Sequence, residues 1–136
     1  MYLLDTDILS NLLRRSPSTP LIAKIASVAP EQQFTSSITL GELIYGAYRV
    51  PTRTASLLER SEESLLSNLA VLLFDAAAAR QYGEVRAELE TRGTLLGDAE
   101  LRIGSIALAR GLTVVTGNVK HFERIPRLPV ENWLQE

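Results

Sequence analysis

The stretch MYLLDTD, residues 1–7, places a short apolar run directly before two carboxylates. The run over Tyr2–Leu4 predicts a short buried strand, and Asp5 follows at its end. A charge beside a hydrophobic core is costly unless it is paired or binds a cation. The stretch therefore indicates either the start of a helix, with Asp7 as its N-cap, or one half of a functional site.

Strand-like and helix-like segments alternate along the rest of the chain. Strands are expected at 33–35, 71–74 and 113–116, and helices at 8–14, 21–28, 40–49, 57–69, 76–90 and 101–110. Residues 125–130 contain prolines and are expected to be irregular. The alternation favours a parallel sheet covered by helices on both faces. With 136 residues and no evident linker, a single domain over residues 1–136 is expected.

The composition excludes several classes of protein. The chain has no cysteine, which excludes disulfides and thiolate metal sites and fits a reducing compartment such as the cytoplasm. Acidic residues interrupt the N-terminus where a signal peptide needs an apolar run, and no apolar stretch approaches the roughly 20 residues that span a membrane.

The net charge of −2 means that nucleic acid, if bound, must be held by a local basic patch. Two candidate patches are Lys120, His121, Arg124 and Arg127, and Arg49 with Arg53. The first follows the predicted strand at 113–116 directly. We therefore expect Lys120 and Arg124 to contact nucleic-acid phosphates if the end of this strand forms the site.

Acidic and polar side chains occur where a parallel α/β sheet places its site, at the carboxyl ends of strands and the starts of helices. They are Asp5, Asp7, Glu42, Asp98, Glu100 and Asn118. Some have structural alternatives. Glu42 could complete a capping box with Thr39, and Asp98 could cap a helix. Glu100 would suit the first helical turn, and Asn118 a turn.

Convergence of these carboxylates would favour a divalent cation. Neighbouring carboxylates raise one another's pKa, and a bound cation relieves their repulsion. Oxygen ligands without cysteine or histidine suit Mg²⁺ or Mn²⁺ rather than zinc. Such an ion can activate water for phosphodiester hydrolysis.

Taken in order, several motifs resemble the PIN-domain ribonucleases, specifically the VapC-type toxins of prokaryotic toxin–antitoxin pairs. They are LLDTD (3–7), SITLGEL (37–43) with Gly46, GTLLGDAE (93–100), GLTVVTGN (111–118), FERI (122–125) and VENW (130–133). Each motif is weak alone, but their order and spacing over nearly the whole chain are specific.

The resemblance implies a three-layer α/β/α domain with a central, mostly parallel sheet, which cleaves RNA with Mg²⁺ or Mn²⁺. It implies that Asp5, Glu42 and Glu100 are metal-binding carboxylates and that Asn118 is a fourth polar group of the site. Ligands or water would be oriented by Thr6, Asp7 and Thr116. It also implies a cognate antitoxin protein as partner, a homodimer and a cytoplasmic location without membrane contact.

Two departures from the family pattern leave alternatives open. Glu100 stands where the family usually has Asp, and Arg102 interrupts a run that is normally apolar. Asp98 could therefore serve as the third metal ligand instead of, or beside, Glu100. A catalytically weakened PIN-like module that binds RNA or a partner protein is one competing interpretation. A haloacid-dehalogenase-like phosphatase is another, because Asp5-x-Asp7 follows an apolar strand, although Leu9 stands where that family has Thr or Val.

Overall fold

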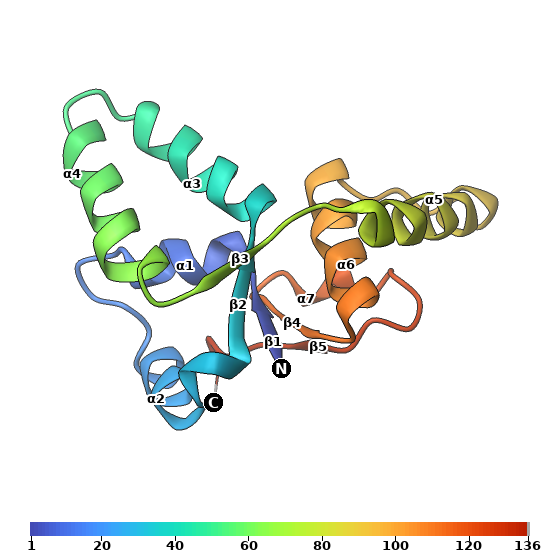
Figure 1. Ribbon diagram of the computed structural model, residues 1–136, viewed down its shortest axis with the longest axis horizontal. Coiled ribbons are helices and arrows are strands. Elements are labelled where there is room, and N and C mark those ends of the chain that lie inside the picture. Colours follow the sequence, from blue (N-terminus) through green and yellow to red (C-terminus); the bar gives the residue numbers. More distant parts are fainter. Residues whose placement is uncertain (136) are drawn as a thin grey trace.

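The computed structural model describes residues 1–135 and contains a five-stranded sheet between two layers of helices (Figure 1). All neighbouring strands are parallel, in the order β3-β2-β1-β4-β5. The strands are β1 (Tyr2–Leu4), β2 (Gln33–Ser36), β3 (Ala70–Leu72), β4 (Thr113–Val115) and β5 (Val130–Glu131). The helices are α1 (Thr6–Leu12), α2 (Thr19–Ser27), α3 (Ser37–Tyr48), α4 (Thr54–Arg60), α5 (Ala76–Thr91), α6 (Asp98–Arg110) and α7 (Val119–Phe122). A 3-10 turn, η1 (Pro30–Gln32), and a π-helical segment, η2 (Ser61–Leu66), complete the elements.

Alternate side chains of the central strands define the two core layers. Leu3 and Val114 are paired across β1 and β4 and face one core cluster, which includes residues of α5 and α6. Leu4 and Val115 are the next pair and face a second cluster, which includes residues of α1 and α2. The expected three-layer arrangement is therefore confirmed, and the sheet is parallel throughout its described strands.

The order of the strands creates a switch point between β1 and β4. The chain runs from β1 outward through β2 to β3, then returns to the other side of β1 as β4. In such sheets a crevice forms at the carboxyl ends of the two strands where the direction reverses. Asp5 directly follows β1 and Thr116 directly follows β4, so both lie at this crevice.

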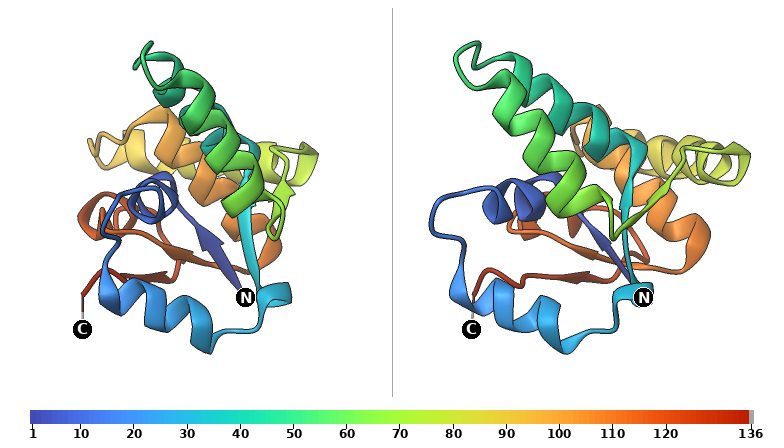
Figure 2. Two further views of the ribbon diagram at one scale, coloured as in Figure 1. Left: turned by 90° about the vertical axis from the view of Figure 1, so that its left-hand side faces the viewer. Right: turned by 60° about the vertical axis from the view of Figure 1, so that its left-hand side comes forward.

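Helices α3 and α4 form a hairpin that projects away from the sheet (Figures 1 and 2). Several large apolar side chains remain exposed on this hairpin, including Tyr45 at 64% and Tyr48 at 63% exposure. Over residues 1–135, none of the helices has the length and apolar character that a bilayer-spanning segment requires.

Two helix ends are set by local side-chain and backbone chemistry. Asp75 caps α5, because its side chain accepts a hydrogen bond from the Ala78 N–H at 3.0 Å. Gly111 ends α6 with φ of 67°, a left-handed conformation that glycine adopts without steric cost.

Three capping predictions were wrong. Helix α3 begins at Ser37 and is capped by the Ser36 hydroxyl, which accepts from the Thr39 N–H, so Thr39 and Glu42 form no capping box. The N-cap of α1 is Asp5, and Asp7 lies inside the helix. Gly97 precedes α6 as its N-cap, and Asp98 is the first helical residue.

The remaining differences concern short or irregular elements. The helix expected over 57–69 is instead α4 followed by the π-helical η2, and the Ser61 hydroxyl donates to the Leu57 carbonyl at the junction. Part of the segment expected to be irregular pairs with β4 as β5. This two-residue edge strand follows Pro129 and is too short to show a periodic pattern.

Candidate active site

A pocket of about 760 Å³ opens at the carboxyl ends of β1 and β4. Four carboxylates line it, contributed by the end of β1 and by α1, α3 and α6. The lining residues are Asp5, Thr6, Asp7, Ser10, Asn11, Arg14, Glu42, Ala99, Glu100, Ile103, Gly117, Asn118 and Leu134. The fold thus brings together the acidic side chains predicted from the sequence, except Asp98.

Asp5 is the most deeply buried of these acids, with 7% of its surface exposed. Its backbone N–H donates to the Val115 carbonyl at 3.0 Å, and the Thr116 hydroxyl donates to its carboxylate at 2.9 Å. Burial, with the nearby charges of Asp7 and Glu42, raises the pKa of Asp5 to about 7. The fold therefore holds a carboxyl group where a positive charge would be favourable.

Glu42 reaches the pocket from the middle of α3. The Thr6 hydroxyl donates to its carboxylate at 2.6 Å, and the Thr6 and Thr39 hydroxyls lie 3.1 Å apart. This contact joins α1 to α3 across the pocket. Thr6 is therefore bonded to Glu42, and Thr116 to Asp5, so each hydroxyl can orient one acid of the pocket.

Asp7 connects α1 to the loop after β4. Its carboxylate accepts from the Gly117 N–H at 2.8 Å and lies 3.3 Å from the Thr116 hydroxyl. A Cβ at position 117 would lie 2.7 Å from Leu134 Cδ1 and 2.8 Å from the same carboxylate oxygen, so a larger residue there would displace these side-chain ends.

Glu100 enters the pocket from the first turn of α6. Its Oε2 lies 3.2 Å from the Asn118 amide nitrogen and 2.8 Å from His121 Nδ1. Its Oε1 lies against Gly97, where a Cβ would approach to 2.8 Å. His121 is half-buried and lies within hydrogen-bond distance of an acid of the pocket, a contact that its place in a candidate basic patch did not predict.

Asp98 lies outside this group. Its carboxylate accepts from the Tyr82 hydroxyl at 2.6 Å and from Arg102 Nε at 2.7 Å. The Tyr82 bond, helped by Arg102, lowers the pKa of Asp98. The guanidinium of Arg102 also lies over the ring of Phe74. Arg102 therefore contributes to the contact between α5 and α6, and the Asp98 side chain is bonded there and does not line the pocket that contains Glu100.

The basic residues are distributed differently from the sequence expectation. Among the described residues that line the pocket, Arg14 is the one cationic side chain, a position that the sequence analysis did not predict. Asp7, Ser10, Asn11 and Arg14 are three or four residues apart, as on one face of a helix, and this spacing could have indicated that Arg14 faces the same pocket as Asp7. Lys120 is exposed on α7, whereas Arg124 donates to the Leu95 carbonyl at 2.8 Å.

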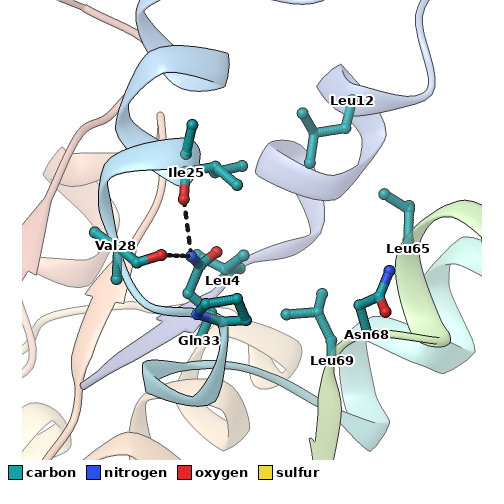
Figure 3. A pocket seen from close by; sticks show the side chains of 10 residues that line it. Leu4, Leu12, Ile25, Val28, Gln33, Leu65, Asn68 and Leu69 are labelled. Atoms are coloured by element: carbon teal, nitrogen blue, oxygen red, sulfur yellow. Dashed lines mark hydrogen bonds between the residues drawn. The ribbon is translucent and has the colours of Figure 1, made fainter.

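A second pocket, of about 450 Å³, lies between α1, α2 and η2 and has a different character (Figure 3). Its walls are mainly apolar and include Leu12, Ile25, Leu65 and Leu69. The amide of Gln33 donates to the Ile25 and Val28 carbonyls, each at 3.0 Å. None of the lining residues that the structure describes is ionisable, in contrast to the acidic pocket at the ends of β1 and β4.

Comparison with known proteins supplies an independent line of evidence. The family model described as PIN domain matches residues 2–128. The chain is 37% identical to the tRNA(fMet)-specific endonuclease VapC of Salmonella typhimurium over 97% of both chains. FitAcB from Neisseria gonorrhoeae is similar in structure, with a TM-score of 0.91 and 30% identity over 100% of both chains. VapBC2 from Rickettsia felis, bound to a DNA fragment from its promoter, has a TM-score of 0.83 and 34% identity over 97% of this chain and 98% of that one.

Proposed function

This chain belongs to the PIN-domain family, and we propose that it is the ribonuclease toxin of a toxin–antitoxin pair, cleaving RNA at the pocket that contains Asp5. The single observation that carries the proposal is the convergence of four carboxylates at the switch point of the sheet, with Asp5 buried among them. The relatives with nuclease names match over nearly their whole length. The phosphatase alternative is wrong, because the PIN match covers residues 2–128.

The donor set of the pocket fits a hard divalent cation. Carboxylate, hydroxyl and amide oxygens surround it, and these are the ligands of Mg²⁺ and Mn²⁺. The raised pKa of Asp5 supports the fit, because its burial and the nearby charges of Asp7 and Glu42 make a cation favourable at this position. Within residues 1–135, no three His, Asp or Glu side chains lie close enough together to form a cluster that could hold a metal ion by itself. Mg²⁺ does not require one, because it retains several waters.

We assign the holding of the cation to Asp5, Glu42 and Glu100, and exclude Asp98. A bound Mg²⁺ or Mn²⁺ would supply positive charge to the phosphodiester and make a water molecule a better nucleophile. The protein's own contribution is to fix the acids: Thr116 holds Asp5 and Thr6 holds Glu42. Asn118 donates to Glu100 and closes the pocket from the side of α7.

Arg14 and Lys120 are the residues that we propose contact RNA phosphates. Arg14 lines the otherwise acidic pocket, where it can neutralise a phosphate that enters beside the carboxylates. Lys120 is exposed on α7, next to the pocket residue Asn118. Arg124 would contribute through the part of its guanidinium that is not bonded to Leu95.

The partners follow from the same assignment. The similar structures FitAcB and VapBC2 support a protein antitoxin as partner. Because the proposed substrate is RNA, we expect the protein to act in the cytoplasm. A homodimer is supported by the projecting α3–α4 hairpin, where Ile44, Tyr45 and Tyr48 expose apolar surface. Light scattering of Tyr45→Lys tests this dimer: the variant should be monomeric if the hairpin forms the interface.

RNA cleavage by the purified protein tests the proposed function. Initiator tRNA is the first substrate to offer, because the Salmonella relative is named for it. Cleavage should require Mg²⁺ or Mn²⁺ and stop with EDTA. Asp5→Asn should lower the rate about 100-fold or more, since the charge stabilisation by a metal is worth several kcal/mol. Glu31→Gln is the matched control, because it also replaces an acid by its amide but at an exposed residue that does not line the pocket. Full activity of Asp5→Asn would refute the site, whereas RNA binding without cleavage by the wild type would favour the weakened-module alternative.

A further inference from the structure

His121 is the only histidine of the chain, and its ring touches an acid of the active-site pocket. Nδ1 lies 2.8 Å from Glu100 Oε2. The same Nδ1 lies 2.9 Å from the Asn118 amide nitrogen, so its role depends on where the ring carries its proton. A carboxylate only accepts hydrogen bonds, so with the proton on Nδ1 the ring donates to Glu100, and the Asn118 amide donates to the same Oε2 at 3.2 Å.

Two segments that flank the Glu100 carboxylate in space, α7 and the residue Gly97, hold this contact in place. His121 belongs to the four-residue α7, and the next residue, Phe122, is completely buried in the core. Phe122 thus fixes the position from which His121 reaches the pocket. On the opposite side, Glu100 Oε1 lies against Gly97, where a Cβ would be 2.8 Å away. The carboxylate is held between the start of α6 and α7.

Glu100 needs such support more than a shorter acid would. Glutamate has one more rotatable bond than aspartate, so its carboxylate can occupy more positions. Asn118 alone offers a 3.2 Å contact to Oε2, which is longer than the His121 contact. Carboxylates that bind metals are generally held by further hydrogen bonds, and the loss of one such bond typically costs about 10- to 100-fold in metal affinity or activity.

We propose that His121 is a positioning residue: it donates Nδ1–H to Glu100 Oε2 and, opposite Gly97, holds this carboxylate in the orientation that receives the divalent cation. The inference rests on the proposed metal-dependent function, because it assigns Glu100 a partner for that role. His121 acts through Glu100 and does not itself touch the reacting atoms.

The test measures Mn²⁺ binding by calorimetry without RNA. His121→Leu removes the donor and should weaken Mn²⁺ binding about 10-fold. His121→Asn should restore binding to within about 3-fold of the wild type, because its Nδ2 can take the place of Nδ1. Gly97→Ala, which pushes on Oε1 from the other side, should also weaken binding. Glu123→Gln, an exposed change in the same segment, is the control and should bind Mn²⁺ like the wild type.

A second measurement needs no variant. The long-range ¹H–¹⁵N spectrum of the metal-free wild type contains one histidine, so its protonated ring nitrogen can be assigned directly. A proton on Nδ1 supports the inference, and an unprotonated Nδ1 overturns it. Wild-type Mn²⁺ affinity in His121→Leu also overturns it, provided that Asp5→Asn loses binding. If Asp5→Asn binds Mn²⁺ normally as well, the metal site of the proposed function is refuted too.

Discussion

Replacing Asp5 with Asn should stabilise the metal-free protein, and the gain should grow with pH. The pKa of Asp5 is raised from 3.8 to about 7 by burial and by the charges of Asp7 and Glu42. Because the pKa of Asp5 is raised in the folded state, the contribution of this carboxyl group to the free energy of unfolding is fully present below about pH 4, where the group is neutral in both the folded and the unfolded state. That stability is lost as the pH rises through about 7, because the folded protein must then bury a charge.

The size of the effect follows from the same pKa change. A rise from 3.8 to about 7 corresponds to about 4 kcal/mol at most, at 1.36 kcal/mol for each pKa unit. Asn keeps an oxygen that can accept from Thr116 but carries no charge. For a chain of this size, about 4 kcal/mol corresponds to a rise in Tm of about 10–15 °C. The gain of Asp5→Asn should approach that value at pH 8 and be small at pH 4.5.

Thermal unfolding followed by circular dichroism, in EDTA and at constant ionic strength, measures this directly. Glu31→Gln removes an exposed carboxylate and should show no such pH dependence. Mn²⁺ at 100 times its dissociation constant should stabilise the wild type by about 2.7 kcal/mol at pH 8 and Asp5→Asn by much less. An Asp5→Asn variant with no higher Tm than the wild type at pH 8, or with an equal gain at pH 4.5, would refute the reasoning.

Three further outcomes are expected. Asp98→Ala should lower the free energy of unfolding by about 1 kcal/mol, because the Tyr82 and Arg102 hydrogen bonds are lost. The RNA cleavage rate should not change. A loss of cleavage would show that Asp98 takes part in the active site. Arg14→Ala with Lys120→Ala should weaken RNA binding and reduce the steepness of its salt dependence by about two charges, and an unchanged slope in a filter-binding titration contradicts these contacts. Gly117→Ala should displace Asp7 and reduce cleavage, measured as kcat, while Gly83→Ala, where a Cβ meets no atom, should have no effect.

Much of the fold could be predicted from the sequence because the signals are local. Three apolar residues followed by acids define β1, and β-branched residues define β4, since buried strands need continuous apolar runs. Asp75 and Gly111 mark helix ends by chemistry that acts within a few residues. The alternation of elements then leaves a parallel sheet as the favoured arrangement, and Asp5 at its carboxyl edge.

The membership of the site depended on tertiary packing. Asp98 and Glu100 are two residues apart, so a helix turns them to different sides, and only the packing of α6 against α5 decides which of them faces the pocket. Glu42 had an equally good local explanation as a cap until Ser36 was found in that role. The contact of His121 with Glu100 joins residues 21 positions apart. Local sequence determines which groups can carry charge and where chains turn, whereas rotation of helices about their axes, set by burial, determines which charges meet.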